Sequence, residues 1–292
     1  MNEFVLIRGV ERIREALAVR GFSVRSLHNR LLPVPGGAWS EWGDVQEVLK
    51  SSGVECRAAG KTIAVLAVDD VEESVRAIQF HRPVQAAPKP EWYESNWKSF
   101  TRRAYGRRTS AAEHSPVFAY LAKSISKAGI LTAHSFDGRG AGRPYLEFSG
   151  AWNGVWFEYL LECHMSLGDL HYHWAVTPGT YGKARLTPRL PADRRRWDIG
   201  KLQEDTVRMG RWLERHADDV RAMKRTCFKY RSMKREAEAL AEDYEGLRRW
   251  MRGKIAEAST SANALAKAAH APAKAARPSA KAVASKGTSQ GA

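Results

Sequence analysis

Three prolines divide this chain near the end of its first third. Pro83, Pro88 and Pro90 lie close together. Proline has no backbone N–H to donate and restricts the residue before it, so no helix or central strand runs through such a stretch. The chain has 292 residues, a length typical of two compact domains or of one domain with extensions. We therefore expect a linker at 85–95 with folded parts on either side.

Residues 1–84 are predicted to form a small α/β unit. Apolar residues at helical spacing indicate a first helix that reaches Leu17. A second short helix is predicted from Val24 to Leu32, because Pro33 would end it. The remaining predicted elements are helices at 42–49 and 70–80 and strands at 54–57 and 62–68.

Residues 10–32 also fit a helix-turn-helix. Gly21 would make the turn, since glycine tolerates a positive φ. The second helix would then offer Arg25, Asn29 and Arg30 to base edges, where Arg reads guanine and Asn reads adenine. The alternative is two ordinary amphipathic helices, which the same residues satisfy.

Residues 96–197 are predicted to form an α+β domain with an antiparallel sheet. A helix is expected from Pro116 to Lys127, because proline is favoured at the start of a helix. Short aromatic and β-branched runs separated by glycine-rich turns follow it, as in hairpin-connected strands. The predicted strands are Ile130–Phe136, Tyr145–Ser149, Val155–Leu161 and His171–Val176.

Residues 198–258 are predicted to form one long helix or a helical hairpin. Apolar residues recur there at alternating steps of three and four, as in a coiled coil. This seam predicts either a homodimer through residues 199–255 or packing against the chain's own sheet. Residues 259–292 contain thirteen alanines, five Lys or Arg and no acid, and are expected to be a disordered basic tail.

The net charge points to a polyanionic partner. Lys and Arg number 47 against 32 Asp and Glu, which leaves +15 at pH 7. A chain this basic attracts DNA, RNA or an acidic surface. No apolar run approaches the ~20 residues of a membrane span, so no membrane partner is expected. We expect nucleic acid, either DNA or RNA, as the partner.

The stretch 97–108 combines aromatic and basic residues. Aromatic rings can stack on unpaired bases, and arginines can neutralise phosphates. The alternative places the aromatics in the core and leaves the arginines in solvent. The candidate contacts are Trp97, Lys98, Arg102, Arg103, Tyr105, Arg107 and Arg108.

Two further basic segments are candidate phosphate contacts. A glycine-rich loop at 137–144 carries Arg139 and Arg143 and joins two predicted strands. It lacks the P-loop pattern, so we expect a hairpin tip rather than a nucleotide site. Arg194, Arg195 and Arg196 precede Asp198, which is expected to cap the following helix.

Two groups of residues are candidate metal or catalytic sites. Cys163, His164, His171 and His173 form the one group with metal-ligand residue types, but their spacing matches no zinc module. His134 could join Glu147 and Glu158 across the predicted sheet, and Glu158 is assigned to a strand. We expect no bound metal or cofactor.

Cysteine usage indicates the compartment. Cys56, Cys163 and Cys227 are odd in number and far apart, which predicts reduced thiols and a cytoplasmic location. Taken together, the sequence predicts an α+β, non-enzymatic, nucleic-acid-binding accessory or regulatory protein. Two alternatives remain, a nuclease or transferase centred on the 130–176 sheet, and an interaction module that dimerises through its C-terminal helix.

Overall fold

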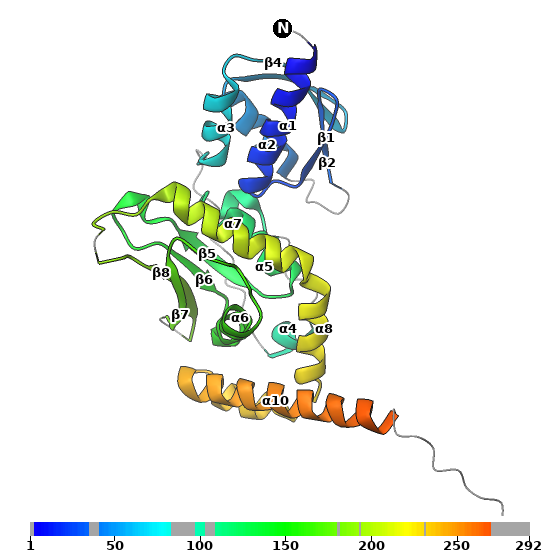
Figure 1. The fold of residues 1–292 in the computed structure, drawn as a ribbon, viewed down its shortest axis with the longest axis vertical. Helices are drawn as coiled ribbons and strands as arrows, with labels where there is room; N and C mark the ends of the chain where they lie inside the picture. Colours follow the sequence, from blue (N-terminus) through cyan, green and yellow to red (C-terminus); the bar gives the residue numbers. More distant parts are fainter. Residues whose placement is uncertain are drawn as a thin grey trace, which may run out of the picture.

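The computed structural model describes residues 3–34, 41–82, 97–102, 109–179, 182–192, 194–230 and 232–269. The fold is α+β with two four-stranded antiparallel sheets, as predicted (Figure 1). We call residues 3–82 the first unit and residues 97–269 the second unit. The predicted linker at 85–95 lies outside the described residues.

The first unit packs helices on one side of its sheet. Ile13 and Leu17 of the first helix contact Leu31 and Ile63 of the sheet within one apolar core. The strand order is β1-β2-β4-β3. Its elements are α1 (Glu3–Val19), β1 (Val24–Leu27), β2 (Arg30–Pro33), α2 (Glu41–Ser51), β3 (Val54–Ala59), β4 (Thr62–Val68) and α3 (Val71–Gln79).

The predicted helix from Val24 to Leu32 is wrong, and so is the helix-turn-helix at 10–32. These residues form the β1–β2 hairpin, in which Val24 pairs with Pro33 and Leu27 with Arg30. Val24 and Leu31 are buried while Arg25 and Arg30 are exposed, which is the alternation of a half-buried strand. His28 in the turn has φ 55°, a left-handed conformation that no α-helix accommodates.

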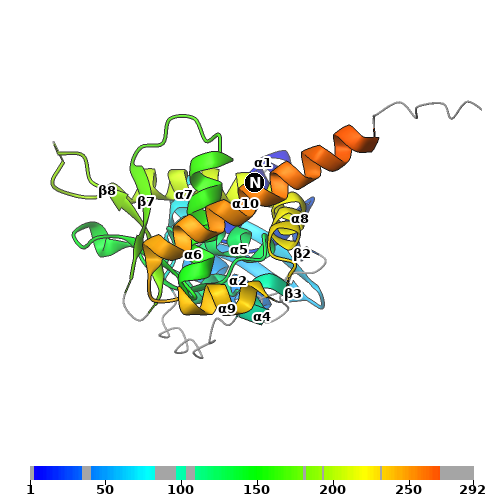
Figure 2. The ribbon, with the colours of Figure 1, turned by 90° about the horizontal axis from the view of Figure 1, so that it is seen from below.

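The second unit places a sheet against two helices. The strand order is β5-β6-β8-β7, and α6 lies along one side of the sheet (Figure 2). Its first elements are α4 (Trp97–Arg102), α5 (Ala119–Lys127), β5 (Thr132–Phe136), β6 (Tyr145–Phe148), α6 (Ala151–Cys163), β7 (His173–Pro178) and β8 (Ala184–Arg189), with short 3₁₀ turns η1 (Ala111–Glu113) and η2 (Gly138–Gly140).

Two assignments in this unit were wrong. The predicted strand Val155–Leu161 lies within helix α6. Val155, Trp156 and Phe157 are all buried, and a helix buried on all sides has no amphipathic period to distinguish it from a buried strand. Strand β8 was missed because it contains Pro188, and proline is rare in a central strand such as this one.

The C-terminal region is neither one rod nor a hairpin. It consists of α7 (Ile199–Arg215), α8 (Ala217–Cys227), α9 (Met233–Ala239) and α10 (Tyr244–Ala269). The chain changes direction at His216, which ends α7 and begins α8. The predicted disordered tail is also wrong over residues 259–269, because the alanine-rich sequence continues α10 there.

The apolar seam of this region faces the second unit's own core. Leu202, Met209, Val220 and Met251 share one buried cluster with Trp156 of α6. Helix α10 crosses α6 at one end of the molecule (Figures 1 and 2). The seam that predicted a homodimer is therefore occupied within the chain.

Candidate nucleic-acid interface

The second sheet has a core side and a polar side. Leu146, Phe148, Leu186 and Trp174 point into the core cluster. Since strand side chains alternate, the residues between them point the other way. That side carries no α-helix among the described residues (Figure 2). We call it the outer face of the second sheet, and it is lined by His134, Tyr145, Glu147, His173, Thr177, Arg185, Thr187 and Arg189.

A single carboxylate organises the centre of this face. The Oε1 of Glu147 accepts from Lys183 Nζ at 2.8 Å, and its Oε2 accepts from Arg185 Nε at 2.9 Å. His134 Nδ1 lies 3.3 Å from Oε1. Burial by itself raises the pKa of Glu147, but hydrogen bonds from His134, Lys183 and Arg185 outweigh it and lower the pKa to about 2. Glu147 is thus a fixed anion that holds three basic side chains in place.

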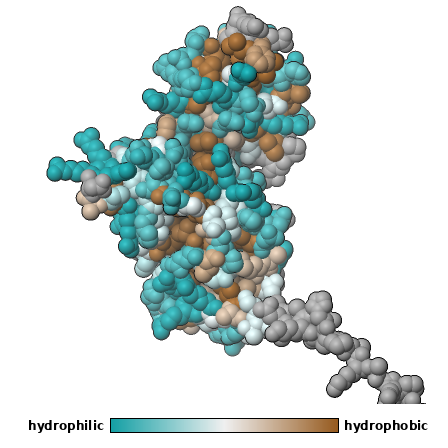
Figure 3. Space-filling view, in the orientation of Figure 1, coloured by the Kyte–Doolittle hydropathy of each residue, from teal (hydrophilic) through white to brown (hydrophobic). Residues whose placement is uncertain are grey.

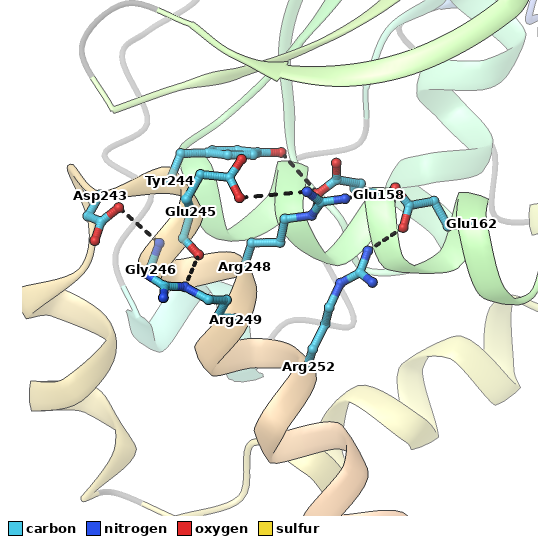
Figure 4. Close-up of polar contacts among 9 residues, drawn as sticks. All are labelled: Glu158, Glu162, Asp243, Tyr244, Glu245, Gly246, Arg248, Arg249 and Arg252. Atoms are coloured by element: carbon cyan, nitrogen blue, oxygen red, sulfur yellow. Dashed lines mark hydrogen bonds and ion pairs between the residues drawn. The ribbon is translucent and has the colours of Figure 1, made fainter.

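The predicted contact of His134 with Glu147 is confirmed, whereas the predicted contact with Glu158 is wrong. Glu158 lies on α6, where Arg248 Nε of α10 approaches its Oε2 at 3.1 Å and Tyr244 OH donates to it at 3.5 Å (Figure 4). Burial raises the pKa of Glu158, which Arg248 partly counteracts. This group joins two helices and does not belong to the outer face.

Tyr145 contacts basic side chains on both neighbouring strands, Arg185 on β8 and His134 on β5. The guanidinium of Arg185 lies 4.6 Å from the Tyr145 ring centroid, a cation–π distance. His134 Nε2 lies 3.0 Å from the Tyr145 hydroxyl. Arg143 donates to the Thr187 hydroxyl at 3.4 Å, so the loop at 137–144 is tied to β8. Arg185, His134 and Arg143 are therefore held over the sheet by these contacts.

Positive charge is in surplus on this part of the molecule. Residues 132–149 and 173–197 contain eight Lys or Arg and three acids. Of these acids, Glu147 binds Lys183 and Arg185, and Asp137 pairs with Arg82. Hydrophilic side chains gather on the side of the molecule where β7 and β8 lie (Figure 3). The face is suited to a polyanion.

Several basic residues predicted as contacts lie at or beside this face. Arg139 and Arg143 are exposed in the β5–β6 connection, which is a hairpin tip as predicted. The guanidinium of Arg194 lies 5.9 Å from the Tyr172 ring centroid. Arg195 and Arg196 are exposed ahead of α7, whose start Asp198 caps as predicted. No described contact joins the 194–196 segment to Arg139 or Arg143.

Trp97 is not a stacking platform. Its side chain is only 5% exposed, and its ring lies 5.4 Å from Phe100 and 5.7 Å from Trp152 between centroids. The alternative, in which the aromatics of this stretch enter the core, is confirmed for Trp97 and Phe100. Lys98 and Arg102 lie on α4, but their side chains, and all of Arg103, Tyr105, Arg107 and Arg108, lie outside the described residues.

Arg25, Asn29 and Arg30 do not form a recognition helix. Arg25 and Arg30 are exposed on the β1–β2 hairpin. Asn29 donates its amide to the Val65 carbonyl at 3.3 Å, which links the hairpin turn to β4. Their placement on a sheet removes the major-groove helix on which base reading was predicted.

The candidate metal ligands are dispersed. His171 Nε2 lies 2.7 Å from Glu204 Oε2, and His164 Nε2 lies 3.2 Å from the Tyr159 hydroxyl. Within the described ranges, no three His, Cys, Asp or Glu side chains are arranged to hold a metal ion. Cys56, Cys163 and Cys227 are free thiols.

The sequence reasoning missed Lys183, Arg185 and Arg189. A period-two pattern, Arg185-x-Thr187-x-Arg189, places polar residues on one side of a strand and would have revealed the two arginines. Pro188 within that pattern argued against a strand.

Comparison of the chain with models of protein families, with curated proteins and with solved structures finds no match. In the part of the chain that the structure describes, no helix combines the length and apolar character needed to cross a bilayer.

Proposed function

We propose that this protein binds nucleic acid through the phosphate backbone, as a non-enzymatic accessory or regulatory factor. The outer face of the second sheet is the contact surface. The observation that carries the proposal is the surplus of basic side chains there. Arg185 is bound to Glu147 and Arg143 to Thr187, and Arg189 is exposed beside them.

Charge and order both support a phosphate partner. Phosphate neutralisation releases counterions and supplies most of the non-specific affinity of nucleic-acid-binding proteins. Arg143 and Arg185 already have restricted side chains through Thr187 and Glu147, so binding costs less conformational entropy. Arg139 and Arg189 are exposed at the borders of the face and can reach further phosphates.

The state of Glu147 favours binding over acid–base catalysis. A carboxylate whose pKa is about 2 stays ionised at neutral pH and is a poor proton donor or acceptor there. Its three basic neighbours occupy both of its oxygens. We assign it the role of holding Lys183, Arg185 and His134 in position.

The test is a binding titration at several salt concentrations with duplex DNA, single-stranded DNA and RNA of equal length. Log affinity should fall linearly with log salt for the wild type. The variant Arg139→Ala/Arg143→Ala/Arg189→Ala should reduce that slope by up to roughly 2.7 units, since each phosphate contact contributes about 0.9.

The matched control is Arg211→Ala/Arg215→Ala/Arg225→Ala. It removes the same charge from exposed positions on α7 and α8. It should leave the slope close to that of the wild type. Equal losses in the two triple variants would show that net charge alone drives binding and that the face is not a site. Absence of salt-dependent binding in the wild type would overturn the proposal.

A further inference from the structure

The two units have the same topology. The first runs α1-β1-β2-α2-β3-β4-α3, and the second runs α5-β5-β6-α6-β7-β8-α7. Numbered within each unit, the strands of both sheets lie in the order 1-2-4-3. In both units the first helix packs against the last, α1 against α3 and α5 against α7. The chain is therefore a tandem repeat of one fold, although its two halves show no repeat in sequence.

Local geometry repeats as well. His28 and Arg139 are the non-glycine residues with positive φ in the described chain, and each lies between the first two strands of its unit. Gly60 and Gly182 have φ 57° and 63° in the turns between the last two strands. Asp70 and Asp198 cap the last helix of each unit.

The first sheet has an outer face that corresponds to the one described for the second. Register pairs Leu27 with Arg30, Arg30 with Ala64, and Ala64 with Arg57, so these four residues form one row across all four strands. Directly paired residues share a face of a sheet. The next row contains the buried pair Leu31 and Ile63, so the row of Arg30 faces away from the core.

This outer face is basic and its arginines are available. The four strands carry Arg25, Arg30 and Arg57 against one acid, Glu55. All three arginines are exposed, and none makes a hydrogen bond or ion pair with another described residue. Ala64 lies between Arg30 and Arg57 and has only a small side chain. The backbones of the two arginines are two strand spacings apart, about 10 Å.

We infer that the outer face of the first sheet, formed by Arg25, Arg30, Arg57 and Ala64, is a second phosphate-binding surface for nucleic acid. The inference rests on the proposed function, because it assigns the same ligand to the equivalent face of a repeated fold. Charge complementarity selects the partner, since three exposed cations on a small sheet suit a polyanion. Leu27, 56% exposed beside Arg30, can contact the apolar part of a sugar or base.

The experiment compares three full-length variants by salt-dependent titration with the same nucleic acids. Arg25→Ala/Arg30→Ala/Arg57→Ala should lower the slope of log affinity against log salt by up to roughly 2.7 units. Arg25→Lys/Arg30→Lys/Arg57→Lys keeps the charges and should keep most of the slope. The control Arg8→Ala/Lys50→Ala/Arg76→Ala removes three cations from the helices of the same unit and should change the slope little.

The outcomes separate this inference from the proposed function. If the second-sheet triple variant lowers the slope and the first-sheet triple variant does not, the inference fails while the proposed function stands. The exposed Leu27 would then indicate a protein partner for this face. If both lower it, combining them should lower it by the sum, because the sites are separate. A thermal melt equal to that of the wild type confirms that each variant is folded.

Discussion

Glu41 of the first unit accepts a hydrogen bond from the backbone N–H of Ala111 in the second unit, with Oε1 and N 2.7 Å apart. The backbone carbonyl of Ala111 accepts a hydrogen bond from Arg20 Nη1 at 2.9 Å. The backbone N–H and C=O of buried Ala111 are therefore both satisfied by side chains from the first unit. Lys123 of α5 completes the contact, with Nζ 2.6 Å from Glu41 Oε2. The two units are joined by directed polar contacts as well as by apolar packing.

Replacing Glu41 should weaken this junction. Glu41→Ala leaves a buried N–H unpaired and Lys123 without its partner, so we expect a loss of about 2 kcal/mol in the free energy of unfolding. Glu41→Gln keeps an acceptor for Ala111 and should lose less. Urea unfolding measures both. Glu47→Ala, at an exposed position on the same helix, is the control. Equal stability of the Glu41→Ala and Glu47→Ala variants would show that the junction contributes nothing.

Gly154 of α6 allows that helix to approach the sheet closely. A Cβ built there would overlap the Cβ of Ala184 on β8, with Phe148 and Val176 at 3.5 Å. Gly154→Ala should therefore destabilise the protein by about 1–3 kcal/mol through overpacking. The same change at Gly253 of α10, where nothing lies within 4 Å, should stabilise it by up to about 1 kcal/mol. Opposite signs in thermal or denaturant unfolding test the packing, and a neutral Gly154→Ala would contradict it.

The fold was predictable where pattern and local chemistry agree. Asp70 followed by an amphipathic run marked α3, and Gly60 between β-branched runs marked the β3–β4 hairpin. Prediction failed where tertiary packing overrides the pattern. Trp156 lies in a helix with no polar face, and Val24 was read as helical because Pro33 seemed a stop signal when it is a strand residue.

The candidate site was only partly predictable. Arg143 was found because glycines around it indicate a loop, and the His134–Glu147 contact follows from strand alternation. Arg185 was missed with its strand. The outer face of the first sheet, which carries Arg30 on β2, could not be matched to that of the second sheet from the sequence. The two units share a topology but not a residue pattern. Only the paired registers make it visible.

The low pKa of Glu147 has a consequence for stability in acid. The folded pKa of about 2 lies below the ordinary value of 4.5, so the unfolded chain binds this proton first as pH falls. The stabilising contribution is complete above about pH 4.5 and is lost as pH falls towards 2. Glu147→Gln should flatten the free energy of unfolding between pH 5 and 3 relative to the wild type. Parallel profiles for the two proteins, measured by urea titration at each pH, would contradict the assignment.

Lys224 should make the stability of the protein rise with pH in the neutral to alkaline range. Its ammonium is buried in the second unit, where it donates to the Gly129 carbonyl and lies 4.6 Å from the Phe100 ring centroid. Burial lowers the pKa of Lys224 to about 7, from an ordinary value of 10.5. Between these two values the unfolded chain holds a proton that the folded chain has released. This residue's contribution to stability must therefore rise with pH across that window, by up to about 1.4 kcal/mol per pH unit.

Lys224→Met removes the titrating group while keeping a long side chain. We expect the unfolding free energy of the wild type to rise relative to that of this variant as pH increases from 7 to 9. Cys227 works against the trend in the wild type, because burial raises the pKa of its thiol to about 11, but it is present in both proteins and cancels in the difference. Lys229→Met, at an exposed position, should show a constant difference over the same range. If Lys224→Met gives a constant difference too, Lys224 keeps its proton in the fold, and its contacts with Gly129 and Phe100 outweigh the cost of burial.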